Sequence, residues 1–285
     1  MELTVCKFGG TSLANTGNIK RVCDIIKADP RRRVIVVSAP GKRTRDDIKI
    51  TDILFEIHDL KEEGKNFDKP FNDFKQRFSD INREFKLVNN LDEIMEEFYT
   101  ELRGQNADFI TSTGEYFMAK LMADIIGFEF VDLDKTAVVS FDEAGNVDLA
   151  SSRKNFEQFR GCKVIIPGFY GIVNNSKSLS SSAPAGTIKT FSRGGSDITG
   201  AIIANIADAA LYENWTDVDG VYDKDPSKHS DAKKFDRLSY AEVEELARNG
   251  ANVLHPDCIP FVREKNIPIN LKNTFNPSAP GTLIN

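Results

Sequence analysis

Residues 3–12 read Leu3-Thr-Val-Cys-Lys-Phe-Gly-Gly-Thr-Ser12, an apolar strand that leads directly into two glycines and a hydroxyl pair. A helical pattern follows and continues to about Lys27. Glycines let the backbone approach a ligand closely and adopt positive φ, and a helix N-terminus offers unpaired N–H groups to an anion. Lys7 adds a full positive charge near the end of the strand. The stretch favours a phosphate site, to which Ser12 can add a hydroxyl; a tight turn with a surface lysine explains the same residues.

The second half of the chain repeats this arrangement. Thr187–Phe191 is predicted to be a strand, and Ser192-Arg-Gly-Gly-Ser-Asp197 follows it before an apolar helical run over residues 198–206. Two glycine-rich helix starts, one with Lys7 and the other with Arg193 and Asp197, can face one polyanion from both ends of a transferred group. Phosphoryl transfer requires this geometry, because its catalysis consists mostly of positioning and charge neutralisation.

The composition limits the classes of partner and compartment. The 285 residues carry 37 Lys and Arg against 43 Asp and Glu, so no basic excess indicates a nucleic acid or an anionic membrane as partner. Four cysteines are scattered without a C-x-x-C spacing, which predicts buried free thiols in a reducing compartment rather than a metal or redox site. With no signal-like N-terminus and no apolar run of about 20 residues, we expect a cytoplasmic protein that does not enter a membrane.

The residues between the two glycine motifs indicate an α/β organisation. Val34–Val37 is predicted to be a buried strand of a parallel β-α-β unit. The loop from Ser38 to Thr44 follows the carboxyl end of that strand, where α/β sheets bind ligands. Residues 51–102 form a charged helical region with phenylalanines at three- and four-residue spacing, which is typical of a core or an interface. We expect this region to cover the site or to meet a partner subunit.

The middle of the chain carries weaker signals. Ala107–Thr111 is predicted to be a strand, and Gly114 to begin a helix. Glu115 then lies in a first helical turn, either as a simple N-terminal charge or as the partner of a substrate ammonium. Phe130–Leu133 and Ala137–Phe141 are predicted to be short strands, and residues 174–186 a mobile hairpin tip.

A cluster of acidic and aromatic residues follows the last predicted strands. Asp217 and Asp225, beside Trp215 and Tyr222, suit a purine and a ribose, although an ordinary Asp-rich turn explains the same residues. Ser239 and Glu242 have the spacing of a capping box, which predicts a helix start.

Four segments resemble the aspartokinases of the amino acid kinase superfamily. They are Lys7-Phe-Gly-Gly-Thr-Ser12, Phe191-Ser-Arg-Gly-Gly-Ser-Asp197, Trp215-Thr-Asp-Val-Asp-Gly220 and Val253-Leu-His-Pro256, with Gly114-Glu-Tyr116 between the first two. The likeness covers almost the whole chain in the right order. It implies a three-layer α/β/α sandwich around a largely parallel sheet. The catalytic domain would span residues 1–285, with an amino-acid-binding lobe at about 1–170 and a nucleotide-binding lobe at about 171–285.

The resemblance also implies a reaction. The γ-phosphoryl of ATP would pass, with Mg²⁺, to the side-chain carboxylate of L-aspartate, the first step of the biosynthesis of the aspartate family of amino acids (lysine, threonine and methionine). A carboxylate is already nucleophilic at neutral pH, so the absence of a catalytic His or Cys is expected. The partners would be aspartate and ATP, and a homodimer is compatible with the family.

Residue roles follow from the same resemblance. Lys7 and Asp197 would be catalytic, and Gly9, Gly10 and Ser12 would contact phosphate. The amino-acid substrate would be bound by Ser38, Thr44, Glu115, Arg193 and Ser196, with Glu115 on the ammonium and Arg193 on the α-carboxylate. The nucleotide would be bound by Thr216, Asp217, Tyr222 and Asp225, and no side chain is expected to ligate a resident metal.

The chain departs from the family pattern in two respects. Many aspartokinases have a lysine where this chain has Asn252 and an arginine where it has Ser227, so we expect weaker nucleotide binding or a substitute cation such as Lys224 or Lys228. The family usually continues into C-terminal ACT domains, and this sequence is expected to lack them and the lysine or threonine feedback that they mediate. Two alternatives stay open: another acid kinase, such as a glutamate-type enzyme, and a regulatory relative with little turnover.

Overall fold

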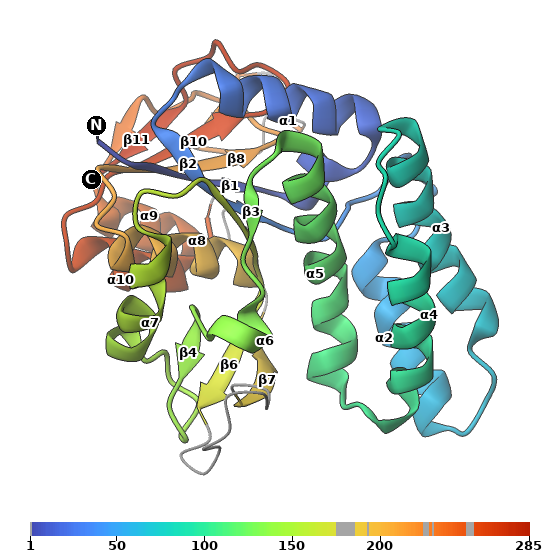
Figure 1. Ribbon diagram of the computed structural model, residues 1–285. Helices are drawn as coiled ribbons and strands as arrows, with labels where there is room; N and C mark the ends of the chain where they lie inside the picture. The colour runs from blue at the N-terminus through green and yellow to red at the C-terminus, as the bar shows by residue number, and fades with distance from the viewer. Residues whose placement is uncertain (1, 175–185, 193, 225–227, 230, 249–253) are drawn as a thin grey trace.

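An eight-stranded, mostly parallel sheet forms the centre of the protein (Figure 1). The computed structural model describes residues 2–174, 186–192, 194–224, 228–229, 231–248 and 254–285. Within these residues the strand order is β3-β5-β2-β1-β8-β10-β11-β9, and only the β10–β11 pair is antiparallel. The strands are β1 (Thr4–Phe8), β2 (Arg32–Val37), β3 (Glu129–Phe130), β5 (Val164–Pro167), β8 (Leu211–Thr216), β9 (Arg237–Leu238), β10 (Ile269–Asn273) and β11 (Thr282–Ile284).

Strand β1 lies in the middle of this sheet and is buried along its whole length. Successive side chains of a strand point to opposite faces. Cys6 and Phe8 accordingly join a core cluster on one face, whereas Val5 joins the cluster on the other. Lys7 shares the face of Val5. The strand is buried on both sides because helices cover both faces of the sheet.

The first core cluster is formed by helices α1 (Thr16–Ala28), α2 (Ile50–Glu62), α3 (Asp68–Glu84), α4 (Leu91–Glu101) and α5 (Ala107–Ile126), which pack with one face of the sheet. The predicted phenylalanine stripe lies in this core. Phe74 contacts Phe78, Phe98 and Phe117 at ring-centroid distances of 5.0, 6.3 and 5.8 Å. The predicted parallel sheet and the helical region over residues 51–102 are therefore confirmed. A subunit contact of these helices stays a prediction.

The opposite face of the sheet is covered by a second group of helices. It comprises α6 (Leu133–Thr136), α7 (Leu149–Phe156), α8 (Gly195–Ile206), α9 (Tyr240–Arg248) and α10 (Ile259–Arg263), with 3₁₀ turns at 10–13, 102–104, 157–159 and 256–258 elsewhere in the chain. Figure 1 shows α1 and α8 on opposite sides of the sheet. A small second sheet of β4 (Ser140–Phe141), β6 (Tyr170–Asn174) and β7 (Gly186–Thr190) lies at the end of the molecule away from α1. The capping box is confirmed, because Glu242 accepts from the backbone N–H of Ser239 at 2.7 Å.

Several local predictions were wrong. Residues 107–111 open helix α5 rather than forming a strand, because Asn106 caps the helix by accepting from the N–H of Phe109, and the Thr111 hydroxyl donates back to the Ala107 carbonyl. Tertiary packing here overrides the β preference of the threonines. Glu115 consequently lies in the middle of a helix and not in its first turn. The predicted strands at 130–133 and 137–141 shorten to two residues each, and Leu133 begins α6.

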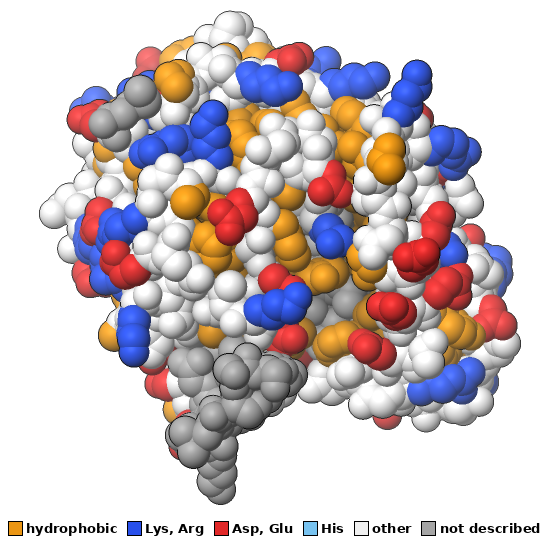
Figure 2. All heavy atoms as spheres, viewed as in Figure 1, with side chains coloured by type: hydrophobic (Ala, Val, Ile, Leu, Met, Phe, Trp, Pro, Cys, Tyr) orange, Lys and Arg blue, Asp and Glu red, His pale blue; other side chains and the backbone are white. Residues whose placement is uncertain are grey.

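Residues 175–185 of the predicted hairpin tip lie outside the described residues, although β6 and β7 on either side pair antiparallel. Among the described residues no helix is long and apolar enough to span a bilayer, and no group of three or more His, Cys, Asp or Glu residues is arranged to hold a metal ion. Blue and red side chains are interspersed over the face seen in Figure 2, without a continuous basic field.

Candidate active site

Lys7 and Asp197 form a largely buried ion pair at the centre of the molecule. Their Nζ and Oδ1 atoms are 2.6 Å apart, and the two side chains are 10% and 19% exposed. Lys7 comes from the carboxyl end of β1, and Asp197 from the first turn of α8. The glycine motif permits this placement, because Gly194 caps α8 with a φ of 74°, in the left-handed region that favours glycine. The predicted helix start at the second glycine motif is thus confirmed.

Asp197 is held by two side chains of the neighbouring strand β8. Asn214 donates to its Oδ1 at 2.9 Å, and the Tyr212 hydroxyl donates to its backbone carbonyl at 3.1 Å. Asn214 lies opposite Lys7 in the β1–β8 register, so these two side chains share one face of the sheet, and both contact Asp197 of α8. Asn214 thus binds the same carboxylate oxygen that the Lys7 ammonium contacts, and Tyr212 holds the backbone of the residue.

The first glycine loop packs tightly against its neighbours. Gly9 donates its N–H to the Trp215 carbonyl at 3.1 Å, and a Cβ at Gly9 would lie 3.3 Å from the Lys7 ammonium. A Cβ at Gly10 would lie 2.9 Å from the Ala39 carbonyl oxygen, so a side chain there would force the loops apart. Neither glycine has a positive φ, contrary to expectation. The glycines are needed for close approach and not for an unusual backbone conformation.

The structure corrects the local geometry around Ser12. Residues 10–13 form a separate 3₁₀ turn, and α1 begins only at Thr16, behind an Asn15 cap. The Ser12 hydroxyl is fully buried and lies 2.7 Å from Thr274 Oγ1, while its backbone N–H donates to the Gly9 carbonyl. The hydroxyl and the N–H of Ser12 are therefore both bonded inside the protein, and this geometry gives the predicted phosphate contact no support.

Glu115 projects from the middle of α5 into the same region. It is 4% exposed, and no hydrogen-bond partner for its Oε2 is found among the described residues. Burial raises the pKa of its carboxyl group to about 8, against opposing hydrogen bonds from backbone N–H groups, including that of Ala39, and the positive charge of Lys7. A buried carboxylate without a cation of its own is suited to receive the ammonium of a ligand.

Of the other residues predicted to bind the acceptor, Ser38 and Thr44 lie on the loop after β2, and Ser196 lies in the first turn of α8. Ser38 is half-buried and donates its N–H to the Phe8 carbonyl at 3.1 Å, while Thr44 is exposed on the following loop. Ser196 is buried at the start of α8 against Gly168, where a Cβ would lie 2.7 Å from the Ser196 Cβ. Arg193 lies outside the described residues.

The residues predicted to bind the nucleotide do not all lie together in the described part of the chain. Thr216 ends β8, and its carbonyl accepts from the N–H of Thr274, which links it to Ser12. Its hydroxyl donates to Asp217 at 3.3 Å. Tyr222 forms an isolated antiparallel bridge with Lys234 farther along the chain. Asp225, Ser227 and Asn252 lie outside the described residues.

Sequence reasoning missed three neighbours of this site: Asn214, Thr274 and Gly41. Gly41 donates its N–H to the Gly10 carbonyl at 2.8 Å, so it joins the loop after β2 to the glycine loop after β1. Gly41 lies in the predicted ligand-binding loop from Ser38 to Thr44 but was not singled out there, and neither Asn214 nor Thr274 was assigned a role from a motif. For Asn214, the alternation of β8 offered a signal, because it puts this residue on the face of Lys7.

The Lys7–Asp197 pair lies between two glycine-rich turns at the carboxyl end of a parallel sheet. In α/β proteins, glycine-rich turns that lead into helices at this edge commonly bind phosphoryl groups. The comparison with known families agrees. The model of the amino acid kinase family matches residues 2–273, and the chain belongs to this family.

Similar proteins narrow the relationship within the family. The chain is 34% identical to aspartokinase 3 of Bacillus subtilis over 99% of its own length and 63% of the relative. The crystal structure of Clostridium acetobutylicum aspartate kinase superposes with a TM-score of 0.90 at 39% identity, over 100% of this chain and 63% of that one. Escherichia coli aspartokinase III, in complex with aspartate and ADP, gives 0.80 at 28% identity, over 99% and 64%. The chain thus spans just under two thirds of the length of these relatives.

Proposed function

We propose that this protein is an aspartate kinase, which transfers the γ-phosphoryl of ATP to the side-chain carboxylate of L-aspartate and yields 4-phospho-L-aspartate and ADP. The relatives named above carry this activity in their names, and one of them was crystallised with aspartate and ADP. The observation that carries the proposal is the Lys7–Asp197 pair beside the buried carboxyl group of Glu115, whose Oε2 has no hydrogen-bond partner among the described residues. This arrangement offers a cation to a phosphoryl group and an anion to an amino group.

The chemistry needs positioning rather than a general base. A carboxylate oxygen of aspartate attacks the γ-phosphorus, the bond to the β–γ bridging oxygen breaks, and ADP leaves with that electron pair. Lys7 neutralises the negative charge on the transferring oxygens, where a fixed cation in a water-poor site is most effective. Asp197 and Asn214 hold the ammonium in place before substrate arrives.

Recognition of the amino acid divides between two charges. Glu115 receives the α-ammonium, and Arg193 receives the α-carboxylate through its planar, bidentate guanidinium. Ser38, Thr44 and Ser196 lie near the reacting carboxylate. A substrate with both free charges satisfies this set, whereas an N-acetylated acid leaves Glu115 without a partner.

The nucleotide half of the proposal rests on the loops after β1 and β8. Gly9 and Gly10 approach the phosphates, and Thr216, Asp217, Tyr222 and Asp225 line the adenosine. Mg²⁺ enters on the ATP phosphates, because this ion keeps several waters and is commonly bound through substrate oxygens. The lobe boundary near residue 170, a cytoplasmic location and a homodimer are further parts of this proposal.

The test is ATP turnover with L-aspartate, in which the acyl phosphate is trapped as a hydroxamate. Lys7→Ala removes the phosphoryl cation, and Lys69→Ala is the matched control, because the Lys69 side chain is 87% exposed on α3. We expect aspartate-dependent hydroxamate from the wild type and the control but not from Lys7→Ala. L-Glutamate is the competing acceptor. Hydroxamate with glutamate and none with aspartate would identify another acid kinase, and ATP binding without any turnover would indicate a regulatory relative.

A further inference from the structure

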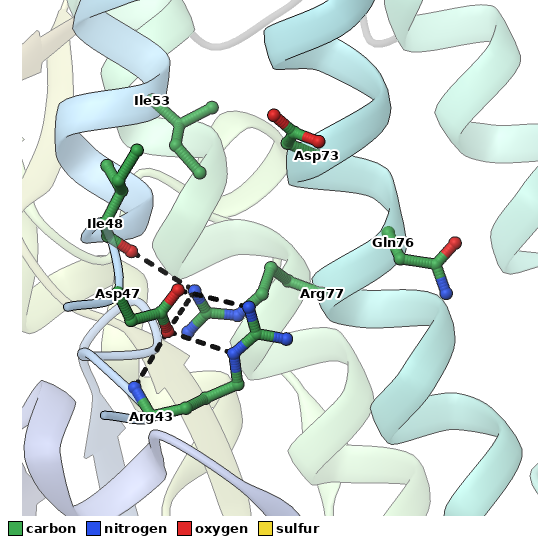
Figure 3. A pocket seen from close by; sticks show the side chains of 7 residues that line it. All are labelled: Arg43, Asp47, Ile48, Ile53, Asp73, Gln76 and Arg77. Carbon is green, nitrogen blue, oxygen red and sulfur yellow. Dashed lines mark hydrogen bonds and ion pairs between the residues drawn. The ribbon is translucent and has the colours of Figure 1, made fainter. Parts of the chain in front are cut away.

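The loop over residues 38–49 joins β2 to α2 and is held by one arginine from a different element. Arg77 projects from α3 and is 5% exposed. Its two terminal nitrogens donate to the Gly41 carbonyl at 2.6 Å and to the Ile48 carbonyl at 3.2 Å, and one of them contacts Asp47 at 3.0 Å. Figure 3 shows this guanidinium beside the loop, with dashed lines to Asp47 and to Ile48.

These contacts are specific to an arginine. A planar guanidinium presents several N–H donors in fixed directions, whereas an ammonium is a single compact charge. Arg77 therefore holds two backbone carbonyls, near the two ends of the loop, in one geometry. Burial of a charged side chain is costly without such partners, and its buried neighbours on α3 include Phe74 and Phe78.

The loop carries this constraint to the candidate site. Gly41, whose carbonyl binds Arg77, donates its N–H to the Gly10 carbonyl, and a Cβ at Gly41 would lie 2.7 Å from the Gly10 carbonyl carbon. At the other end, the N–H of Asp47 donates to the Thr44 carbonyl at 3.2 Å. The loop thus lies between Arg77 on one side and the glycine loop on the other.

We propose that Arg77 is a positioning residue for phosphoryl transfer, which acts by holding the 38–49 loop, and through Gly41 the Gly9–Gly10 turn, in the geometry that the reaction needs. The effect on catalysis rests on the proposed function, whereas the effect of Arg77 on the loop geometry does not. Arg77 touches neither substrate in this scheme. It fixes the backbone against which they bind.

Arg43 provides a matched comparison within the same cluster. Its guanidinium also binds Asp47, at 2.9 and 3.1 Å, but its side chain is 45% exposed and all its side-chain contacts found in the described residues are to Asp47 (Figure 3). Both arginines line the same cavity of about 230 Å³. Replacement of Arg43 therefore removes an arginine–Asp47 pair and spares the bonds to Gly41 and Ile48.

The first experiment measures amide hydrogen exchange of peptides covering residues 38–49 in the protein without substrates. Arg77→Met should raise the exchange rate there by about tenfold or more, whereas Arg43→Met should change it less than about twofold. Equal exchange in the two variants, or wild-type exchange in Arg77→Met, overturns the proposal. Arg77→Lys, which keeps the charge but cannot reach both carbonyls, should be intermediate and replaces Arg77→Met if that variant does not fold.

The second experiment separates binding from turnover. Arg77→Met should lower kcat with aspartate by about tenfold to a hundredfold, because small displacements of reacting groups have effects of this size, and should change the KM for ATP less than about threefold. Arg43→Met should retain wild-type kcat. Full activity in Arg77→Met contradicts the proposal. A wild type inactive with aspartate contradicts the proposed function instead, and the exchange comparison then decides the role of Arg77 alone.

Discussion

The Lys7 ammonium and the Asp197 carboxylate meet at 2.6 Å, although one comes from a central strand and the other from the first turn of a helix. Each charge therefore offsets most of the cost of burying the other. Removal of one member of a buried pair leaves an uncompensated charge, which is far more costly than the loss of an exposed pair. Asn214, which binds the same carboxylate oxygen, makes this a small network.

Asp197→Asn should lower kcat by about a hundredfold, because Lys7 loses the anion that orients it while the side-chain shape is kept. Steady-state kinetics with ATP and aspartate measures the loss. Asp208→Asn is the control, since Asp208 lies just beyond the other end of α8 and forms exposed pairs with Arg153, Arg160 and Lys265. If both variants lose activity equally, the effect comes from general destabilisation and not from the Lys7 pair.

Glu115 should make the stability of the protein depend on pH. Its carboxyl pKa is raised by burial from an ordinary 4.5 to about 8, so the folded state holds a proton that the unfolded state has released between these values. The free energy of unfolding therefore falls as pH rises through this window, by up to about 1.4 kcal/mol per pH unit from this group. Denaturant unfolding from pH 5 to 8 should show this slope, and Glu115→Gln should flatten it.

The same group should release a proton when aspartate binds. At pH 7 the buried carboxyl is mostly protonated, and an incoming ammonium favours its ionised form. Calorimetric titration in buffers of different ionisation enthalpy should detect release of close to one proton in the wild type. Glu115→Gln should release none and bind aspartate more weakly. Equal proton release by both proteins would place the ammonium elsewhere.

The elements that could be predicted from the sequence are those determined by a local pattern. The β1–glycine stretch, the second glycine motif before α8 and the phenylalanine stripe each follow from short-range periodicity or turn chemistry. The start of α5 was misassigned because Thr111 and its neighbours favour strands, whereas packing and the Asn106 cap decide for a helix. Local preference alone could not reveal this.

The site was less predictable than the fold, because its geometry depends on long-range register. Asn214 reaches Asp197 only because β8 pairs with β1 so that Asn214 lies opposite Lys7. The buried Ser12 hydroxyl is hydrogen-bonded to Thr274, which follows the distant strand β10. No spacing within either segment encodes these contacts, so they require the assembled sheet.

Gly41→Ala should damage the site through its backbone. The new Cβ would lie 2.7 and 2.8 Å from the carbonyl carbon and oxygen of Gly10, so one of the two loops must move. We expect at least a tenfold loss of kcat and a lower thermal midpoint. Gly104→Ala is the control, because a Cβ there meets nothing within 4 Å and its φ is not positive. It should leave activity unchanged and keep or slightly raise stability.

The four cysteines should differ sharply in reactivity. Cys6, Cys23 and Cys258 are buried, and burial raises the pKa of the Cys23 thiol to about 11 and those of the other two well above their usual range. Cys162 is only partly buried. A thiol reagent at pH 8 should therefore modify one cysteine rapidly in the native protein and four after denaturation. Rapid native labelling of Cys258, identified by peptide mass, would show that the region beside Asp197 opens readily.

Ser12 and Thr274 allow a test of whether a residue of the glycine motif binds phosphate or supports the fold. Both hydroxyls are fully buried and bonded to one another at 2.7 Å. Ser12→Ala leaves the buried Thr274 hydroxyl without a hydrogen-bond partner, and Thr274→Val does the same to the Ser12 hydroxyl. Each single change should lower the free energy of unfolding by about 1–3 kcal/mol. The double variant leaves neither hydroxyl unpaired, so its loss in free energy of unfolding should be clearly smaller than the sum of the losses of the two single variants.

If Ser12 supports the fold and does not bind phosphate, its replacement should have little effect on the KM for ATP. Ser12→Ala should leave the KM for ATP within about twofold of the wild type when assayed well below its unfolding temperature, because its hydroxyl and N–H are both bonded inside the protein. Thr274→Val should match it, since both variants break the same bond. A tenfold rise in the KM for ATP in Ser12→Ala alone would instead mean that the hydroxyl turns from Thr274 to the phosphate on binding. Additive stability losses in the double variant would point the same way, because the bond between the hydroxyls would then contribute little.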